Sequence, residues 1–130
     1  GGTVAEVLPD STIVIDLLNR VPAAVEFASG EPASSWLLHP IVEVEVLVGA
    51  RSRLQLRRLE THLNRMPAAE IEVADLHHCR AFVKRYTLAH GIGWPDCLIA
   101  ATAMRLGVPV VTLNDRHFRV VRGLRVIRPY

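Results

Sequence analysis

Three acidic residues stand where a carboxylate could take part in catalysis. Asp10 follows a short apolar segment, and Asp96 opens a segment rich in alanine. Glu45 lies inside the apolar run 41–48, where a charged side chain is out of character. Carboxylates that gather repel one another, by about 4 kcal/mol for two charges about 4 Å apart at an effective dielectric of 20. Such a group either holds protons or binds a cation.

The ligand atoms of such a group indicate which cation it would bind. Oxygen ligands alone favour hard ions, so we expect Mg²⁺ or Mn²⁺. Ions of this kind activate a water molecule, neutralise a phosphodiester and orient the leaving oxygen. The three acids therefore indicate a metal-binding site that is suited to hydrolysis of this kind.

Each acid also has a plainer interpretation. Asp10 could simply cap the helix that follows it, and Asp96 could be a favourable charge at a helix N-terminus. Glu43 and Glu45 are two residues apart and point in different directions on a helix, so one of them can be solvated while the other is buried. We expect Asp16 to be a surface residue of the first helix.

The elements that position these acids follow from the pattern of apolar residues and breakers. The pattern predicts strands over residues 3–8, 34–39, 71–73, 108–112 and 124–127. It predicts helices over residues 12–19, 22–29, 40–48, 52–65, 76–90 and 95–106. We expect Asp75 to cap the fifth of these helices. Alternating strands and helices favour an α/β fold with a parallel sheet and helices on both faces. Ligands bind beyond the carboxyl ends of such strands, where Asp10 and Asp115 are expected.

Size and composition set further limits. The chain has 130 residues, half of them hydrophobic, so we expect one domain over residues 1–130. No apolar run reaches the roughly 18 residues that span a membrane, and no secretion signal is recognisable. Cys79 and Cys97 are too few for a disulfide scaffold, which favours two reduced thiols in a cytoplasmic protein.

The basic residues are almost all arginine. Lysine occurs once, as Lys84, so fourteen of the fifteen Lys and Arg residues are arginine. Arginine binds phosphate with a rigid bidentate fork, although a GC-rich genome would give the same bias. Candidates for phosphate contacts, or for an ordinary solvated helix face, are Arg51, Arg53, Arg57 and Arg58.

Four segments match the motifs of a known family. They are DSTIVIDLL from Asp10, HPI followed by EVLVGA around Glu45, PDCLIAATA around Asp96, and TLNDRHF at residues 112–118. With the ending GLRVIRPY, the sequence resembles the PIN-domain nucleases, and most closely the VapC toxins of bacterial toxin–antitoxin pairs. The motif favours Glu45 over Glu43, because Glu45 stands four residues before Gly49.

The resemblance implies a fold, an activity and partners. The fold is a PIN-like three-layer α/β/α sandwich with a central parallel sheet. The activity is Mg²⁺- or Mn²⁺-dependent cleavage of RNA, in loops of tRNA or ribosomal RNA, by a metal-activated water. The partners are a second copy of the chain and a VapB-type antitoxin that inserts a segment across the active site.

The resemblance also assigns roles to residues. Asp10 and Asp96 become metal ligands and Glu45 a further catalytic acid. The fourth acid of the family often stands where this chain has Asn114, and Asp115 is the nearest carboxylate that could replace it. We expect four further residues to contact these acids or the substrate: Ser11, Thr12, Asn114 and Arg116.

Two other functions remain open. Asn114 in place of an acid is compatible with a PIN-like RNA-binding protein of weak catalytic activity. A phosphorylated receiver domain would need a lysine beside the acids, but Lys84 lies in the middle of a predicted helix. We expect a structural role for His117, since metal-activated water makes a histidine base unnecessary, and packing beside Pro95 for Trp94.

Overall fold

The computed structural model describes residues 6–30 and 35–130 of the chain. Its centre is a parallel sheet of three short strands in the order β1 (Leu8–Pro9), β2 (Val110–Val111) and β3 (Val126–Ile127). Leu8 pairs with Val110, which pairs with Val126 on its other side. Isolated parallel bridges continue the pairing beyond β1, from Val7 to Trp36 and from Leu38 to Ala68.

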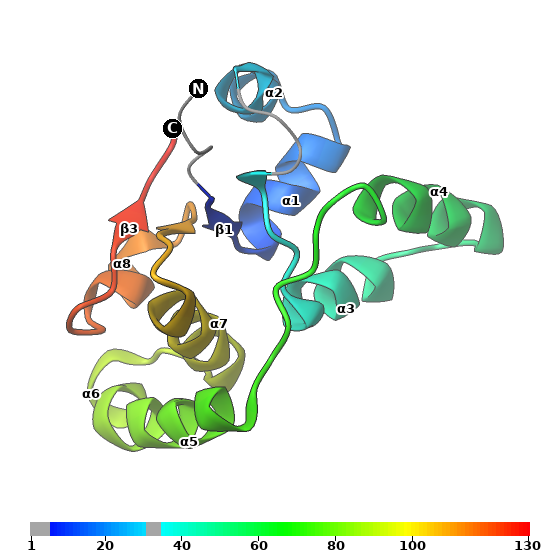
Figure 1. Ribbon diagram of the computed structural model, residues 1–130. Coiled ribbons are helices and arrows are strands. Elements are labelled where there is room, and N and C mark those ends of the chain that lie inside the picture. The colour runs from blue at the N-terminus through cyan, green and yellow to red at the C-terminus, as the bar shows by residue number, and fades with distance from the viewer. Residues whose placement is uncertain (1–5, 31–34) are drawn as a thin grey trace.

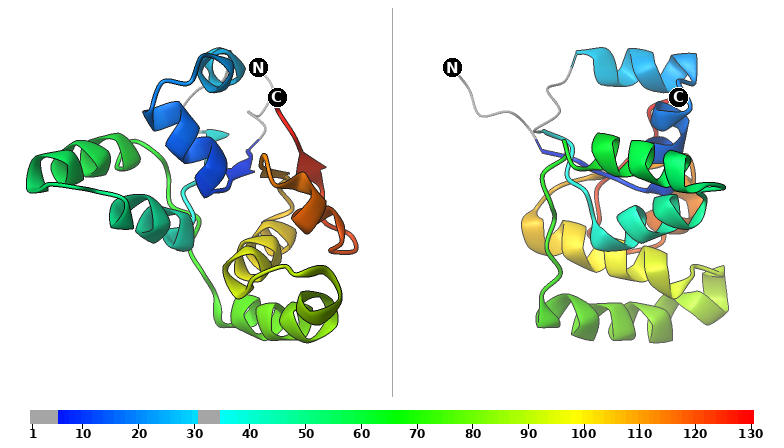
Figure 2. Two further views of the ribbon diagram at one scale, coloured as in Figure 1. Left: turned by 180° about the vertical axis from the view of Figure 1, so that it is seen from behind. Right: turned by 90° about the vertical axis from the view of Figure 1, so that its right-hand side faces the viewer.

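Helices cover both sides of this sheet. Their bounds are α1 (Ser11–Leu18), α2 (Pro22–Ser29), α3 (Pro40–Val48), α4 (Arg53–Leu63), α5 (Val73–Phe82), α6 (Leu88–His90), α7 (Trp94–Leu106) and α8 (Asp115–Arg119). A π-helical turn, Val83–Thr87, joins α5 to α6. Helices α1 and α2 lie on one side of the sheet and α5 to α7 on the other, with α3 and α4 at the end farthest from β3 (Figures 1 and 2). The predicted α/β/α architecture with a parallel sheet is confirmed.

Local sequence signals set the helix ends near the acids. Asp10 caps α1, and its side chain accepts hydrogen bonds from the backbone N–H groups of Thr12 and Ile13. Pro40 occupies the first turn of α3, where its missing N–H costs nothing. Gly107 ends α7 with a φ of 69°, a left-handed conformation that glycine adopts without strain.

The strand predicted over residues 71–73 is wrong. Val73 instead begins α5, which is fixed by a capping box between Glu72 and Asp75. Asp75 is thus the third residue of the helix and not its cap. Its carboxylate also accepts two hydrogen bonds from Arg105, a contact between distant segments that local pattern does not reveal.

The other predicted strands are shorter than expected, and those over residues 108–112 and 124–127 are reduced to β2 and β3. Residues 3–5 and 34 lie outside the described part of the chain. In the described part, β-sheet pairing of the first segment begins at Val7. The segment predicted as a strand over residues 34–39 pairs only through single bridges at Trp36 and Leu38. Helix α8, directly after the β2 loop, has no counterpart among the predicted elements.

Helix α7 is the central support of the fold. Seven consecutive residues, 97–103, are buried, four of them Ala or Cys, so neighbouring elements approach closely. Asp96 in the first turn of this helix is therefore held by a rigid element. Across the residues that the structure describes, no helix combines the length and apolar character that a bilayer crossing requires.

Candidate active site

Asp10 is buried at the carboxyl end of β1, with 3% of its surface exposed. Its Oδ1 accepts hydrogen bonds from the backbone N–H of Thr12 at 3.1 Å and from the Thr12 hydroxyl, and its Oδ2 accepts one from Thr112 Oγ1 at 2.5 Å. Burial raises the pKa of Asp10, and these hydrogen bonds oppose that rise. A carboxylate oxygen accepts about two bonds, so Oδ2 retains capacity for another ligand.

Glu45 reaches the same region from α3. Ser11 Oγ donates a hydrogen bond to Glu45 Oε2 at 3.3 Å, which turns this carboxylate toward the start of α1. Desolvation raises the pKa of Glu45, and the negative charge of Asp10 raises it further.

Asp96 completes the group from the first turn of α7. Burial raises its pKa to about 6, and the charges of Asp10 and Glu45 add to that rise. His117 acts in the opposite direction and lowers the pKa of Asp96. Three segments far apart in sequence therefore place three carboxylates close enough to disturb one another's ionisation. We call Asp10, Glu45 and Asp96 the acidic cluster.

The donors of the acidic cluster suit a small divalent cation. Among residues 6–30 and 35–130, no three His, Cys, Asp or Glu side chains converge closely enough to hold one ion together. Mg²⁺ does not require such a cage, because it usually binds one or two carboxylates and retains several waters. Oxygen donors with raised pKa values also gain most from a cation that relieves their repulsion. The residues present therefore fit Mg²⁺ or Mn²⁺.

Asp115 is directed elsewhere. Its carboxylate accepts hydrogen bonds from Arg119 Nε at 3.2 Å and from Arg128 Nη1 at 3.0 Å, and these contacts lower its pKa. The groups that shift the pKa of Asp96 do not include Asp115. In this arrangement the structure brings together three of the four predicted acids, and Asp115 would have to leave its arginines to join them.

The polar residues expected around the acids divide into two groups. Ser11 and Thr12 contact the acidic cluster directly, through Glu45 and Asp10. Asn114 bonds to Thr112 Oγ1 through its backbone N–H and to His117 through its side chain, and Arg116 is exposed.

Sequence reasoning missed Thr112, whose hydroxyl is the donor to Asp10 Oδ2. The available signal was its position at the end of a predicted strand, within the TLNDRHF motif. Trp94 is 58% exposed, which disagrees with the packing role expected for it.

A groove adjoins the acidic cluster. A cavity of 320 Å³ between α1, α3 and α4 is lined by Ile15, Leu18, Asn19, Glu45, Val46, Gly49, Arg51, Gln55 and Leu59. A second cavity of 380 Å³ between α1, α2 and α4 shares Leu18 with the first. We call the two together the α1–α4 groove.

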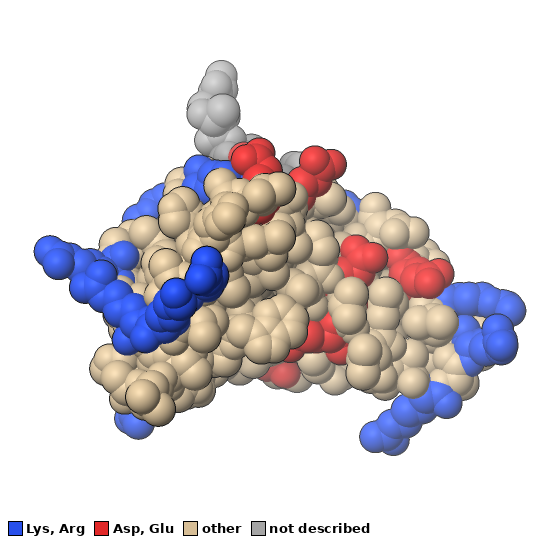
Figure 3. All heavy atoms as spheres, turned by 90° about the horizontal axis from the view of Figure 1, so that it is seen from below, with Lys and Arg blue, Asp and Glu red and all other residues tan. Residues whose placement is uncertain are grey.

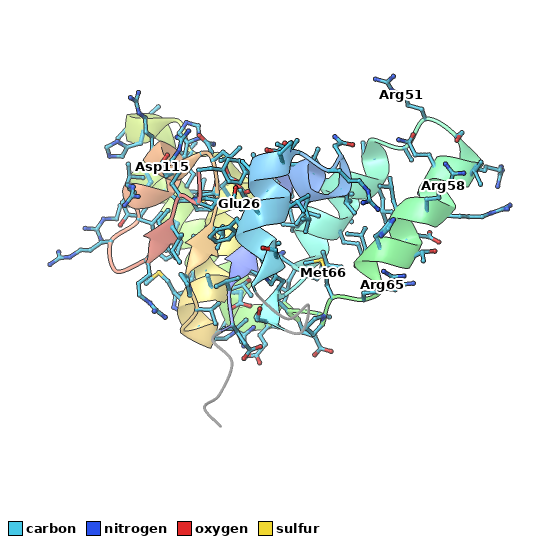
Figure 4. All side chains as sticks on the ribbon, turned by 90° about the horizontal axis from the view of Figure 1, so that it is seen from above. Glu26, Arg51, Arg58, Arg65, Met66 and Asp115 are labelled. Atoms are coloured by element: carbon cyan, nitrogen blue, oxygen red, sulfur yellow. The ribbon has the colours of Figure 1, made fainter. Side chains whose placement is uncertain are left out.

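Basic side chains lie along α4, which forms one side of this groove. Figure 4 shows Arg51, Arg58 and Arg65 along the α4 segment. Seen from below in Figure 3, Lys and Arg side chains gather at the α4 end and at the opposite end of the molecule, with acidic side chains between them.

Comparison with known proteins identifies chains of similar sequence and fold. A family model described as the PIN domain matches residues 7–124. A toxin–antitoxin complex from Klebsiella pneumoniae contains a similar chain with 26% identity and a TM-score of 0.80, and the match covers 96% of this chain and 98% of that one. No match was found among curated protein sequences.

Two further structures share the fold at lower identity. VapBC-1 from nontypeable Haemophilus influenzae matches with 19% identity and a TM-score of 0.75, over 94% of this chain and 96% of that one. FitAcB from Neisseria gonorrhoeae matches with 20% identity and a TM-score of 0.73, over 95% of this chain and 97% of that one. The family model covers most of the residues that carry the acidic cluster and the sheet, and the chain therefore belongs to the PIN domain family.

Proposed function

We propose that this protein is the toxin of a toxin–antitoxin pair and acts as a Mg²⁺- or Mn²⁺-dependent endoribonuclease. The observation that carries the proposal is the acidic cluster, in which burial raises the pKa of all three acids and the charges of neighbouring acids add to the rise for Glu45 and Asp96. The similarity to a chain of the Klebsiella pneumoniae toxin–antitoxin complex over nearly its whole length supports the biological role.

Each acid has a proposed task. Asp10 and Asp96 hold the divalent ion, and the hydrogen bonds from Thr12 and Thr112 fix the orientation of the Asp10 carboxylate. When bound, the ion supplies an activated water and neutralises charge on the phosphodiester. Glu45, oriented by Ser11, is placed to accept the proton of the attacking water, which its raised pKa favours.

The proposed substrate is an unpaired loop of tRNA or ribosomal RNA. Arg51, Arg53, Arg57 and Arg58 are available for its phosphates, because Arg51 precedes α4, the other three lie on it, and all four are exposed. Unpaired RNA suits such a surface, because splayed bases leave the phosphate backbone accessible to side chains. We expect this reaction to take place in the cytoplasm.

The proposed protein partner is a VapB-type antitoxin. The α1–α4 groove has apolar lining residues such as Ile15, Leu18 and Leu59, and basic ones such as Arg51 and Arg65. A segment with apolar and acidic side chains fits this surface. Because Glu45 lines the groove, an occupying segment would block the acidic cluster. Association of two copies of the chain is also proposed.

The biological role is tested by induction in bacterial cells followed by mapping of RNA cleavage sites. Wild-type protein should arrest growth and produce discrete cuts in RNA loops, and co-expression of the neighbouring antitoxin gene should suppress both. Growth arrest with intact tRNA and ribosomal RNA would contradict the proposed substrate.

A second candidate is a PIN-like RNA-binding protein with weak catalysis. The pairing of Asp115 with Arg119 and Arg128 favours it, because the fourth acid is then withdrawn from the site. Calorimetric titration separates the two functions. A ribonuclease should bind Mg²⁺ or Mn²⁺ at millimolar concentration or below, whereas RNA binding without metal binding would support the second candidate.

A further inference from the structure

His117 is held in one orientation by a neighbour. It lies half-buried in α8, and Asn114 Nδ2 is 2.8 Å from its Nδ1. An amide nitrogen only donates hydrogen bonds, so Nδ1 is the acceptor and carries no proton. The proton of the neutral imidazole is therefore on Nε2.

The support for this orientation leads back to the acidic cluster. The backbone N–H of Asn114 donates to Thr112 Oγ1 at 2.8 Å, and Thr112 Oγ1 donates to Asp10 Oδ2. The next residue, Phe118, is fully buried and anchors α8 against the core. A continuous chain of hydrogen bonds thus connects Asp10 through Thr112 and Asn114 to His117, which restricts the imidazole without using its charge.

The Nε2–H of His117 remains available as a donor. Among the described residues it has no hydrogen-bond acceptor, and the ring is only half-buried. The hydrogen-bond chain through Asn114 and Thr112 to Asp10 places the imidazole near the acidic cluster. In agreement with this position, His117 is among the groups that influence the pKa of Asp96. Nearby Arg119 and Arg128 are occupied by Asp115.

A phosphodiester that approaches the acidic cluster meets three carboxylates and needs donors that offset their repulsion. We propose that His117 is a catalytic residue of this site, and that its Nε2–H donates a hydrogen bond to a non-bridging oxygen of the scissile phosphate. Asn114 acts through His117 as a positioning residue. The inference rests on the proposed ribonuclease function and adds a donor to its set of acids. Donors that are fixed before the substrate arrives are the most effective, because no reorganisation is needed during the reaction.

The first test measures cleavage of a short single-stranded RNA in Mg²⁺ by four proteins. They are wild type, His117→Ala, His117→Gln and the control His77→Ala, which changes an exposed histidine of α5. His117→Ala should lower kcat/KM about 10–100-fold, as expected for the loss of one hydrogen bond to a charged group. His117→Gln should recover part of the loss because it retains an N–H donor, and His77→Ala should match wild type. Equal kcat/KM in His117→Ala and wild type would overturn the proposal.

A second measurement separates this proposal from the ribonuclease function itself. RNA binding is followed by fluorescence anisotropy in Mg²⁺ with the Asp96→Asn protein, with and without His117→Ala. Loss of the donor should weaken RNA binding several-fold at an unchanged Tm. If wild type cleaves no RNA, the ribonuclease function fails, and binding alone decides the role of His117. Unchanged RNA binding would then exclude the contact.

The role of Asn114 is tested by a double-mutant cycle. Asn114→Ala should lower kcat/KM in the wild-type background and have little further effect once His117 is Ala. If Asn114→Ala lowers kcat/KM by the same factor in the His117→Ala background as in wild type, Asn114 acts independently of His117. That result would contradict its role as a positioning residue.

Discussion

Nε2 of His39 lies 2.9 Å from Oγ1 of Thr102, 63 residues away in the sequence. His39 Nδ1 accepts the backbone N–H of Ile41, so the proton is on Nε2 and is donated to Thr102. The Thr102 hydroxyl is in turn 3.3 Å from Asp75 Oδ2. His39 caps α3 and Thr102 lies in α7, so this buried contact ties the helix of Glu45 to the helix that begins at Asp96.

Removal of the Thr102 hydroxyl should destabilise the protein more than removal of its methyl group. Thr102→Val keeps the shape but leaves the buried Nε2–H of His39 without an acceptor, so the free energy of unfolding should fall by about 1–3 kcal/mol. Thr102→Ser retains the hydroxyl, so its free energy of unfolding should fall by less. Urea denaturation at pH 7 measures both, and a Val protein at least as stable as the Ser protein would contradict the role given to this contact.

His39 should also make stability depend on pH. Burial lowers its pKa to about 4, below the ordinary value of 6.5. Between these values the unfolded chain binds a proton that the folded protein excludes, so stability falls as the pH is lowered. The total loss from this group is about 3 kcal/mol, and no loss arises above pH 6.5.

Denaturation of wild type and His39→Asn from pH 7 to 4 isolates this effect, since both proteins share all other titrating groups. Asparagine is also a good N-cap residue. Wild type should lose more stability than His39→Asn over this range. Parallel curves would show that the His39 imidazole titrates normally.

Asp96 should change the pH dependence of stability in the direction opposite to His39. Its pKa is raised to about 6 from an ordinary 3.8, so ionised Asp96 destabilises the metal-free fold above pH 6. That penalty disappears as the pH falls toward 3.8, where the carboxyl is protonated in both states. Asp96→Asn should therefore be more stable than wild type at pH 8, by about 2 kcal/mol once solvent screening is considered, and equally stable near pH 4.

The measurement is chemical denaturation in a chelating buffer at pH 8 and pH 4, with Glu26→Gln, an exposed acid of α2, as the control. Glu26→Gln should match wild type at both pH values. A gain for Asp96→Asn that persisted at pH 4 would exclude charge repulsion as its cause.

Asp115 should contribute less to cleavage than the acidic cluster does. Arg119 and Arg128 hold its carboxylate, so the ion pairs must open before it can join the site. Asp115→Asn should lower the cleavage rate less than tenfold, compared with a loss above about 100-fold for Asp96→Asn. Steady-state kinetics of the two variants give the comparison. Equal losses would mean that Asp115 leaves its arginines in the active protein.

Several features set by neighbouring residues were predicted from the sequence, although the capping box of Glu72 and Asp75 was not. Asp10 as the cap of α1 and the predicted helices 40–48 and 95–106 depend on short-range backbone preferences, and α1, α3 and α7 confirm them to within one residue. The acids themselves were found because Glu45 interrupts an apolar helix and Asp96 opens another.

Features set by distant partners were not predicted. The carboxylate of Asp75, in the first turn of α5, pairs with Arg105, thirty residues later. The donor to Asp10 comes from Thr112, 102 residues away. Spacing along the chain gives no sign of such contacts, because they exist only after the sheet and α7 have assembled.

Single-turnover cleavage of a single-stranded RNA by purified protein tests the ribonuclease function most directly. Wild type should cleave in Mg²⁺ or Mn²⁺ and stop when a chelator is added, and Asp96→Asn should be at least about 100-fold slower under the same conditions. Equal rates for wild type and Asp96→Asn, or cleavage that persists in the chelator, would contradict a metal-dependent site built on Asp10, Glu45 and Asp96.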